Sequence, residues 1–350
     1  MPNLLSIVNI LATDFCNHSC NFCFASKEMK SSSKKEFDLR EYAMVVNKCK
    51  EAGFSPALSG GEPTLHSKFP ELLKMTLQNF FHVPINTGGL FTDETEKYMF
   101  RYRHRIALYF NISTPGFVFN KVTRAKVIKR IRKFAGAASK VSLIVTSKFL
   151  SSEDAKIIIN LIDDETIKKC TVRLGVEGVV AGEKAYAGID QFPTMGNNFF
   201  TVFKYVEAKK PKAIIFAKSL TPCMFTEEQR KYLKSKGYLK SYHCHPKEER
   251  FHFSITPQLE TFVCYPLSSR NRSIIKADSS FEKINKEYES LHKKQHKEYV
   301  LSKCKKCPFF GLREGQCPGP CLGFKISLFE KEKGIDSSKL SSYNYIREMI

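Results

Sequence analysis

Three cysteines near the start of the chain have the types and spacing that could hold a metal group. Cys16, Cys20 and Cys23 follow the pattern C-x3-C-x2-C directly after a predicted strand. Three thiolates on one short loop can hold three irons of a cubane iron–sulfur cluster and leave the fourth iron without a protein ligand. The same thiols could bind zinc, with His18 as a further ligand. The spacing alone does not separate these two interpretations.

A glycine-rich turn with one carboxylate is the second candidate. It reads Ser-Gly-Gly-Glu-Pro-Thr, and its two glycines, Gly60 and Gly61, let the backbone approach a ligand closely. Glu62 adds a carboxylate, and Pro63 follows it. The turn could be only a turn. Because it ends the predicted strand that follows the cysteine loop, we expect both motifs at one edge of the sheet, and this favours the iron–sulfur interpretation.

Seven of the twelve cysteines lie beyond residue 210. They are Cys223, Cys244, Cys264, Cys304, Cys307, Cys317 and Cys321, and the last four have the spacing C-x2-C-x9-C-x3-C. Paired cysteines of this kind are typical of a zinc ribbon, and also of an iron–sulfur site. The remaining Cys49 and Cys170 fall within regular elements, so we expect both to be buried as small apolar side chains.

Alternating strand and helix patterns must position these motifs. The predicted strands are Ile7–Ala12, Pro56–Ser59, Val83–Thr87, Ile106–Ser113, Lys140–Thr146 and Cys170–Leu174. The predicted helices are Phe37–Ala52, Phe69–Phe80, Asp93–Phe100, Asn120–Ala138 and Ser152–Ile162. Strands that alternate with helices predict an α/β fold with a parallel sheet, either doubly wound or curled as a partial barrel. In both forms, the loops at the carboxyl ends of the strands carry the chemistry.

The alternation stops at about residue 210. A basic helix (Thr226–Lys236) and a hairpin (Phe251–Tyr265) precede the last cysteines. We therefore expect one large domain over residues 1–210 and a small Cys-rich α+β domain over residues 211–350. So small a domain is more readily held by metal than by core area.

Composition excludes several classes of protein. The 350 residues are 42% hydrophobic and 26% charged, which is unlike a disordered chain or a membrane protein. No apolar run approaches the roughly 18 to 20 residues of a membrane-spanning helix, and the first residues lack the pattern of a secretory signal. We expect a cytoplasmic protein, in which cysteines serve as thiols or metal ligands.

The net charge is +21, and no Asp or Glu occurs between Arg101 and Leu150. Twelve Lys and Arg residues fall in this stretch, and Lys126, Arg130 and Lys133 share one side of a predicted helix. Such a face can attract an acidic peptide or nucleic acid, or it can be a solvated outer helix. No nucleic-acid-binding motif accompanies the charge, so nucleic acid is not expected. Of the two partners, the acidic peptide is favoured only by the family resemblance of the C-terminal cysteines described below.

With the cysteine loop and the Gly60–Glu62 turn together, the sequence over residues 5–210 resembles the radical S-adenosylmethionine (SAM) superfamily. The resemblance implies a (β/α)6 partial TIM barrel. It implies that Cys16, Cys20 and Cys23 bind a 4Fe–4S cluster whose free iron chelates SAM. It places Phe22 near the adenine and assigns Glu62 to the methionine ammonium.

Weaker likenesses extend the implied SAM site. Asn86 and Thr87 resemble the family's turn after the third strand, and Ser113 stands where the family often places a ribose contact. The residues after Ser113 depart from the usual pattern. Arg173 could pair with the SAM carboxylate through its planar guanidinium, or it could be a structural ion-pair partner. His18 and His66 flank the motifs, and a surface or capping role fits each.

The C-terminal cysteines resemble the SPASM/twitch extension, which carries auxiliary 4Fe–4S clusters. Three departures are visible: a longer third spacing, no glycine near Leu259 in the hairpin, and no cysteine after Cys321. By resemblance, Cys223 or Cys244 would join Cys264 and Cys321 on one cluster. Cys304, Cys307 and Cys317 would hold the other, with a non-cysteine or open fourth position. One auxiliary cluster remains the alternative to two.

The resemblance implies an enzyme that reductively cleaves SAM to a 5′-deoxyadenosyl radical and abstracts hydrogen from a peptide or protein. The outcomes we expect are a thioether or C–C cross-link, an epimerisation or an oxidation, with an electron donor such as flavodoxin or ferredoxin. One alternative is a radical SAM enzyme that acts on a small metabolite or nucleotide. A non-enzymatic alternative is a zinc-stabilised nucleic-acid-binding protein, which leaves Gly60, Gly61 and Glu62 unexplained.

Overall fold

The computed structural model describes most of the chain. The described residues are 7–20, 23, 25, 34–136, 139–145, 151–178, 180–181, 188–216, 220–239, 252–268, 272–276, 278–313 and 316–335. Phe22 and Cys244, both predicted to be site residues, lie outside these ranges.

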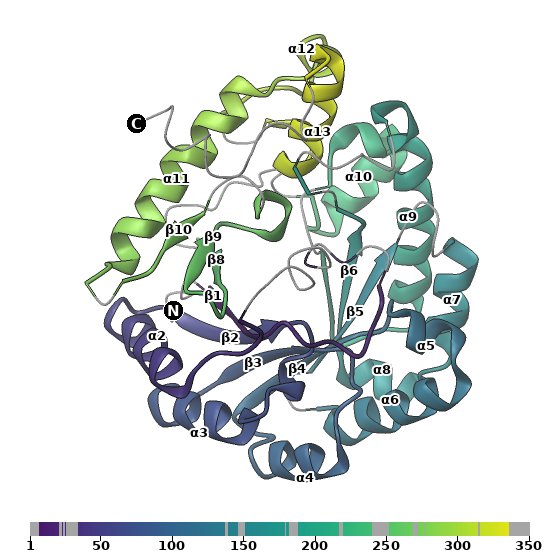
Figure 1. Ribbon diagram of the computed structural model, residues 1–350. Coiled ribbons are helices and arrows are strands. Elements are labelled where there is room, and N and C mark those ends of the chain that lie inside the picture. Colours follow the sequence, from purple (N-terminus) through teal and green to yellow (C-terminus); the bar gives the residue numbers. More distant parts are fainter. Residues whose placement is uncertain are drawn as a thin grey trace.

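A single curved sheet forms the inner layer of the molecule (Figure 1). Its strands are β1 (Ile7–Thr13), β2 (Ser55–Gly60), β3 (Val83–Thr87), β4 (Ile106–Asn111), β5 (Lys140–Val145), β6 (Thr171–Val176), β7 (Ala213–Phe216), β8 (His252–Ile255), β9 (Glu260–Phe262) and β10 (Ser273–Ile274). Their order is β10-β9-β8-β1-β2-β3-β4-β5-β6-β7. From β8 through β7 each neighbouring pair is parallel, whereas β9 and β10 are antiparallel additions at one edge. The predicted mixed α/β fold with a largely parallel sheet is confirmed.

Helices cover the outer side of this sheet (Figure 1). They are α2 (Leu39–Glu51), α3 (Phe69–Asn79), α4 (Asp93–Arg101), α5 (Pro115–Phe119), α6 (Lys121–Phe134), α7 (Ser152–Asn160), α8 (Asp164–Lys169) and α9 (Phe192–Ala208). The predicted helices fall at these positions because their apolar residues face the sheet. In α2, the residues Tyr42, Val45, Val46 and Cys49 are buried, and Asp38 caps the helix by accepting a hydrogen bond from the Arg40 amide.

The C-terminal elements are α10 (Glu227–Ser235), α11 (Phe281–Glu298), α12 (Ser302–Lys305) and α13 (Leu322–Lys333), and α12 and α13 lie at the top of Figure 1. The hairpin of β8 and β9 was expected in a separate small domain, yet it extends the barrel sheet, because β8 pairs with β1 from Ile7↔His252 to Ile10↔Ile255. This pairing covers an edge of β1 that would otherwise be open. Leu259 adopts a positive φ of 59° in the hairpin turn, at the position where a glycine was missing.

One hydrophobic core spans the sheet and its helices, and it includes residues from both expected domains. Cys49 and Cys170 are fully buried in this core, as predicted. The side chains of this core do not fill the space at the carboxyl ends of the strands, and a cavity lies there.

Candidate functional site

A cavity of about 260 Å³ opens at the carboxyl ends of strands β1 to β6. It brings together most of the predicted SAM-site residues. Its lining comprises Cys16, His18, Cys20, Cys23, Ala25, Ser59, Gly60, Gly61, Glu62, Asn86, Thr87, Gly88, Tyr109, Asn111, Thr114, Ser142, Ile144, Arg173, Val176, Glu177, Gly178 and Tyr265. Residues from the ends of all these strands therefore share one space, as expected for a parallel sheet.

The two glycines of the β2 turn let it pack directly against the cysteine loop. The Gly61 amide donates to the Thr13 carbonyl at 2.8 Å, and the Glu62 amide donates to the Phe15 carbonyl at 2.7 Å. Gly60 has a φ of +129°, which favours glycine, and a Cβ there would also collide with Thr13. A Cβ on Gly61 would lie 2.7 Å from the carbonyl carbon of Phe15 and closer still to its oxygen. The turn thus fixes the backbone just before Cys16.

The Glu62 carboxylate is buried at the floor of the cavity and is 1% exposed. Its oxygens accept hydrogen bonds from the Thr64 hydroxyl at 2.6 Å, the Thr87 hydroxyl at 2.9 and 3.0 Å, and the Gly88 amide at 2.8 Å. These donors hold the carboxylate in one orientation. The carboxylate also links the end of β2 to the end of β3.

Burial raises the pKa of Glu62, although the hydrogen bonds from Thr64, Gly88 and Thr87 oppose the shift. Burial likewise raises the pKa of the Cys16 thiol to about 11 and that of Cys20 to about 12. A bound cation would favour the ionised form of each group, and metal binding at the thiols would release protons. Three thiols and one buried acid in one cavity fit a cationic metal cluster together with a cationic ligand.

His18 does not lie on the surface as expected. Its ring packs on Gly88, where a Cβ would be 2.9 Å from its Cε1, and both ring nitrogens are buried without a hydrogen-bond partner among the described residues. Burial lowers the pKa of His18. His66 has the predicted capping role, since Nε2 donates to the Phe37 carbonyl at 3.0 Å and Nδ1 accepts from the Lys68 amide at 2.9 Å.

Other predicted site residues take different places. Arg173 lines the cavity, donates to the Ser142 hydroxyl at 3.1 Å, and has a pKa lowered by burial. Ser113 is not among the lining residues, and its hydroxyl accepts a hydrogen bond from the Ile144 amide at 2.7 Å. Pro63 starts a short 3-10 helix beside the cavity.

Sequence reasoning missed several polar lining residues. They are Tyr109, Asn111, Thr114, Ser142, Glu177 and Tyr265. Most stand at or just after the ends of β4, β5 and β6, so their position at a strand end was the available signal. Tyr265 follows the C-terminal hairpin, and only the pairing of β8 with β1 brings it to the cavity.

Four C-terminal cysteines gather around a second, much smaller cavity. Cys223, Cys304, Cys307 and Cys317 line a space of about 20 Å³ together with Phe310 and Gly319. Burial raises the pKa of Cys304 to about 11 and that of Cys317 to about 12. Within the described ranges, no three His, Cys, Asp or Glu side chains are close enough to hold a single metal ion.

This grouping differs from the expected one. Either Cys223 or Cys244 was expected with Cys264 and Cys321. Cys223 lies instead with the C-x2-C pair, because the turn Pro222–Met224 carries it to the Cys304 loop, and Cys244 lies outside the described residues. Cys321 lines a neighbouring apolar cavity, and Cys264 packs against a separate apolar cluster around Leu322.

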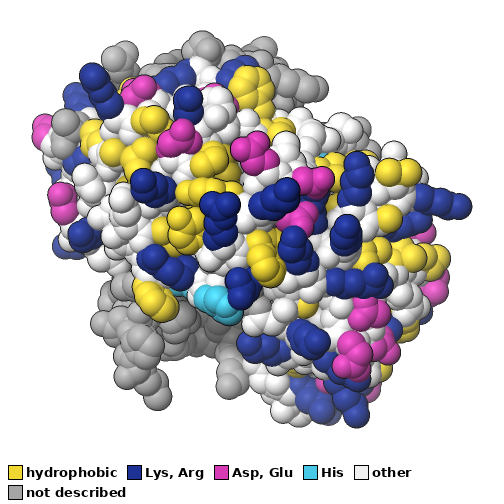
Figure 2. All heavy atoms as spheres, turned by 90° about the horizontal axis from the view of Figure 1, so that it is seen from below, with side chains coloured by type: hydrophobic (Ala, Val, Ile, Leu, Met, Phe, Trp, Pro, Cys, Tyr) yellow, Lys and Arg dark blue, Asp and Glu magenta, His cyan; other side chains and the backbone are white. Residues whose placement is uncertain are grey.

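Lys126, Lys129 and Lys133 of the acid-free stretch are exposed, but the expected basic face is wrong for Arg130, which is 5% exposed and pairs with Asp93 and Glu96 of α4. Lys133 also pairs with Glu96, at 2.6 Å. Acids that precede the stretch in sequence pack against it in space. On the lower face of the molecule, Lys and Arg side chains are interspersed with acidic and apolar ones (Figure 2).

Among the described residues, no helix is both long and apolar enough to cross a membrane.

Comparisons with known proteins agree with this geometry. Residues 10–162 match the sequence model of the Radical SAM superfamily. Over 88 residues, 24% of this chain, the sequence is 38% identical to a 7,8-dihydro-6-hydroxymethylpterin dimethyltransferase of Methanocaldococcus jannaschii, of which the match spans 17%.

Two solved structures share the fold over most of this chain. The first is anSMEcpe with bound AdoMet, with a TM-score of 0.63 and 16% identity over 99% of this chain and 94% of that one. The second is Streptococcus suis SuiB bound to its precursor peptide SuiA, with a TM-score of 0.62 and 14% identity over 93% and 71%. Residues 10–162 are thus similar in sequence to the radical SAM superfamily, and the two solved structures share the fold of this chain.

Proposed function

We propose that this protein is a radical SAM enzyme that modifies a peptide or protein. The observation that carries the proposal is the shared cavity, in which three cysteine thiols of one loop face the Gly60–Glu62 turn. The match of residues 10–162 to the radical SAM superfamily supports it.

In this proposal Cys16, Cys20 and Cys23 hold a 4Fe–4S cluster. When bound, the cluster supplies an electron and SAM supplies the 5′-deoxyadenosyl radical that takes a hydrogen atom from the substrate. Glu62 would receive the methionine ammonium, held in place by its hydrogen bonds from Thr64, Thr87 and Gly88. Arg173 would offer its guanidinium to the SAM carboxylate. The protein's tasks are to orient SAM and to exclude water.

We assign Gly60, Gly61 and Asn86 to the SAM-binding walls and keep Phe22 as a predicted adenine contact. The Ser113 hydroxyl is already used by the Ile144 amide, so a ribose contact there would need a second hydrogen bond to the same oxygen. Asn111, at the end of the same strand, lines the cavity and is a further candidate.

For the C-terminal region we propose one auxiliary 4Fe–4S cluster held by Cys223, Cys304, Cys307 and Cys317. Four thiolates complete the ligand set of such a cluster. In the alternative with two auxiliary clusters, Cys264 and Cys321, with Cys244, would hold the second one. An auxiliary cluster would accept an electron from the product radical or bind a substrate thiolate. About four irons per chain beyond the first cluster would contradict the two-cluster version.

The peptide substrate is supported by the shape of the site and by the shared fold. A cavity of about 260 Å³ is small beside the roughly 300 to 1,000 Å³ of ligand pockets, so SAM itself would fill most of it. A substrate that reaches in from outside, such as an extended peptide, fits this arrangement. SuiB, whose structure contains a precursor peptide, has the same fold. A small-metabolite substrate is the second candidate, favoured by the pterin-modifying relative.

The decisive experiment is anaerobic reconstitution with iron, sulfide and a reductant, followed by assay for 5′-deoxyadenosine formed from SAM. We expect the product from the wild type. Cys20→Ala should abolish it while leaving the absorbance of the C-terminal cluster. Absence of the product, together with bound zinc, would favour the zinc-stabilised nucleic-acid-binding alternative. A mass change in a candidate precursor peptide would separate peptide from metabolite substrates.

A further inference from the structure

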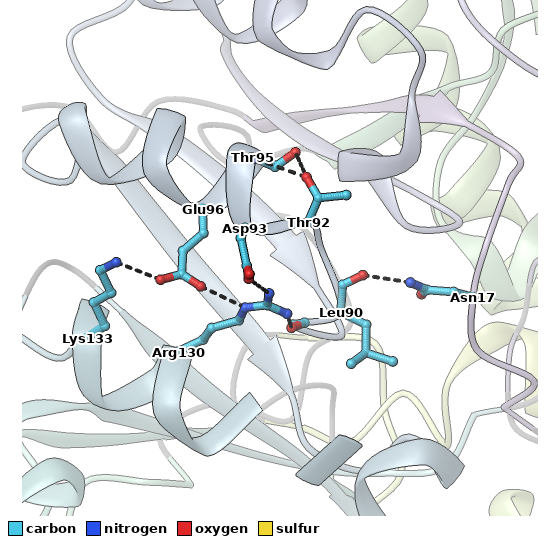
Figure 3. A network of polar contacts seen from close by, with 9 residues as sticks. Asn17, Leu90, Thr92, Asp93, Thr95, Glu96, Arg130 and Lys133 are labelled. Atoms are coloured by element: carbon cyan, nitrogen blue, oxygen red, sulfur yellow. Dashed lines mark hydrogen bonds and ion pairs between the residues drawn. The ribbon is translucent and has the colours of Figure 1, made fainter. Parts of the chain in front are cut away.

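Arg130 lies on α6, an outer helix, yet its side chain points inward and is buried. Its three nitrogens bond to three different groups (Figure 3). Nε donates to Glu96 at 3.0 Å, Nη2 to Asp93 at 3.2 Å, and Nη1 to the Gly89 carbonyl at 2.8 Å. The guanidinium also stacks over Phe91, 4.3 Å from the ring centre. Arg130 therefore ties α6 to α4 and to the loop between β3 and α4.

That loop, Gly88–Leu90, contacts both halves of the proposed cofactor site. On one side, the Gly88 amide donates to the Glu62 carboxylate at 2.8 Å. On the other, the Leu90 carbonyl accepts from the Asn17 side chain at 2.7 Å, within the cysteine loop (Figure 3). The ring of His18 packs on Gly88. One short loop thus contacts the carboxylate and the segment between Cys16 and Cys20.

The side chains of the Gly88–Leu90 loop do little to hold its backbone in one conformation. Gly88 and Gly89 have no side chains, and Gly89 has a φ of +79°. The Gly89 amide bonds to the Thr87 hydroxyl at 2.9 Å, but its carbonyl points to Arg130. A glycine pair gains rigidity from outside contacts, because its own backbone is the most freely rotating of any residue.

We propose that Arg130 is a positioning residue for SAM binding. By holding the Gly89 carbonyl, it sets the Gly88 amide against Glu62 and the Leu90 carbonyl against the cysteine loop. This inference rests on the proposed SAM site at Glu62. The inference also assigns to Arg130 a role other than the attraction of an acidic partner.

Lysine cannot replace arginine here. A single ammonium keeps the charge and could pair with Glu96 or Asp93, but it lacks the planar fork that reaches three partners at once. Arg130→Lys should therefore retain most of the ion pairing and lose the bond to Gly89. Arg130→Met removes both. Arg132→Met is the matched control, because Arg132 lies on the same helix, is half exposed, and pairs with Asp163 at 2.6 Å.

The first measurement is SAM affinity by equilibrium dialysis on anaerobically reconstituted protein. We expect at least tenfold weaker binding for Arg130→Lys and Arg130→Met, and a change within twofold for Arg132→Met. The second is hydrogen exchange at the amides of Gly88–Leu90 in protein without iron or SAM, which should be faster in both Arg130 variants only. Arg130→Lys serves as the test if Arg130→Met fails to fold.

Wild-type SAM affinity and wild-type exchange in Arg130→Lys would overturn the inference. If the reconstituted wild type binds no SAM, the proposed function fails instead. The exchange measurement then decides alone: unchanged exchange at Gly88–Leu90 overturns the positioning role, and faster exchange supports it.

Discussion

Gly61→Ala tests the packing of the glycine turn on the cysteine loop. A Cβ at this position would lie 2.7 Å from the Phe15 carbonyl carbon and 3.0 Å from the Cβ of Cys16. Real Cβ atoms essentially never come within 3.0 Å of such an atom, and here the neighbour is backbone, which cannot rotate away. The substitution must therefore push the Phe15–Cys16 segment away from the turn.

The size of the effect follows from two backbone hydrogen bonds. Gly61 donates to Thr13 at 2.8 Å and Glu62 donates to Phe15 at 2.7 Å, and both would be strained or broken. Loss of a hydrogen bond costs about 1 kcal/mol, and roughly 1–3 kcal/mol when the group left behind is buried. We expect the free energy of unfolding to fall by roughly 2–4 kcal/mol, which leaves a typical domain folded.

The assay counts iron and sulfide per chain after anaerobic reconstitution, together with urea unfolding. Gly61→Ala should lose about as much iron as Cys20→Ala, close to the four of one cubane cluster. Gly53→Ala is the control. Gly53 has a φ of +69°, and no atom lies within 4 Å of the place that a Cβ would take, so alanine there adds backbone strain of about 1–2 kcal/mol but no collision.

Full iron content in Gly61→Ala would refute the reasoning. So would a loss of stability no larger than that of Gly53→Ala. Equal loss of iron in both variants would show that stability alone, and not the geometry of the cysteine loop, governs cluster assembly.

Three further predictions concern charged groups. Glu62→Gln should weaken SAM binding a hundredfold or more, since a charge pair at 4 Å contributes about 4 kcal/mol at an effective dielectric of 20. Because burial raises the pKa of Glu62, the affinity of the wild type for SAM should fall as pH drops through that pKa. Equilibrium dialysis of the variant should show no such dependence of SAM affinity on pH. Lys325 is fully buried beside Cys304, and its positive charge should raise the reduction potential of the proposed auxiliary cluster. Lys325→Met should therefore lower this potential in an EPR-monitored redox titration, where about 59 mV corresponds to a tenfold change in the equilibrium constant of a one-electron reduction. Burial raises the pKa of Glu96, but bonds from Lys133 and Arg130 lower it below its usual range. Its stabilising contribution is therefore present above the unfolded pKa and lost as pH falls through the folded one, and Glu96→Gln should flatten urea-unfolding stability between pH 5 and 3, roughly the range of carboxyl titration.

Local patterns were enough to predict the six strands and the position of the main cavity. Each strand is a short apolar run between turn residues, and each strand end in a parallel sheet meets the same edge. The cysteine loop and the Gly60–Glu62 turn are therefore brought together by topology, without any knowledge of their contacts. The helix ends were less exact, because capping residues such as Asp38 and Asn120 start helices one or two positions from the end of the apolar pattern.

Long-range pairings left no local signal. The hairpin strand β8 joins β1, and Cys223 reaches the Cys304 loop, through contacts between segments far apart in the sequence. A period of two or of 3.6 residues reports which side of an element is apolar and does not report which partner covers it. Spacing therefore identified Cys304 and Cys307 as a pair, whereas it gave no sign that Cys223 lies beside them.

The basic helix illustrates the same limit for charge. A count of Lys and Arg between residues 101 and 150 treats every cation as exposed, yet Arg130 is enclosed by acids of α4 and by a backbone carbonyl. Those acids lie just before the acid-free stretch, so a window drawn along the sequence excluded the partners that folding supplies. A buried cation needs such partners, since an unpaired one would be costly. The net charge of the sequence therefore overstates how much of α6 is open to an acidic partner, and the exposed cations of this helix include Lys126 and Lys129.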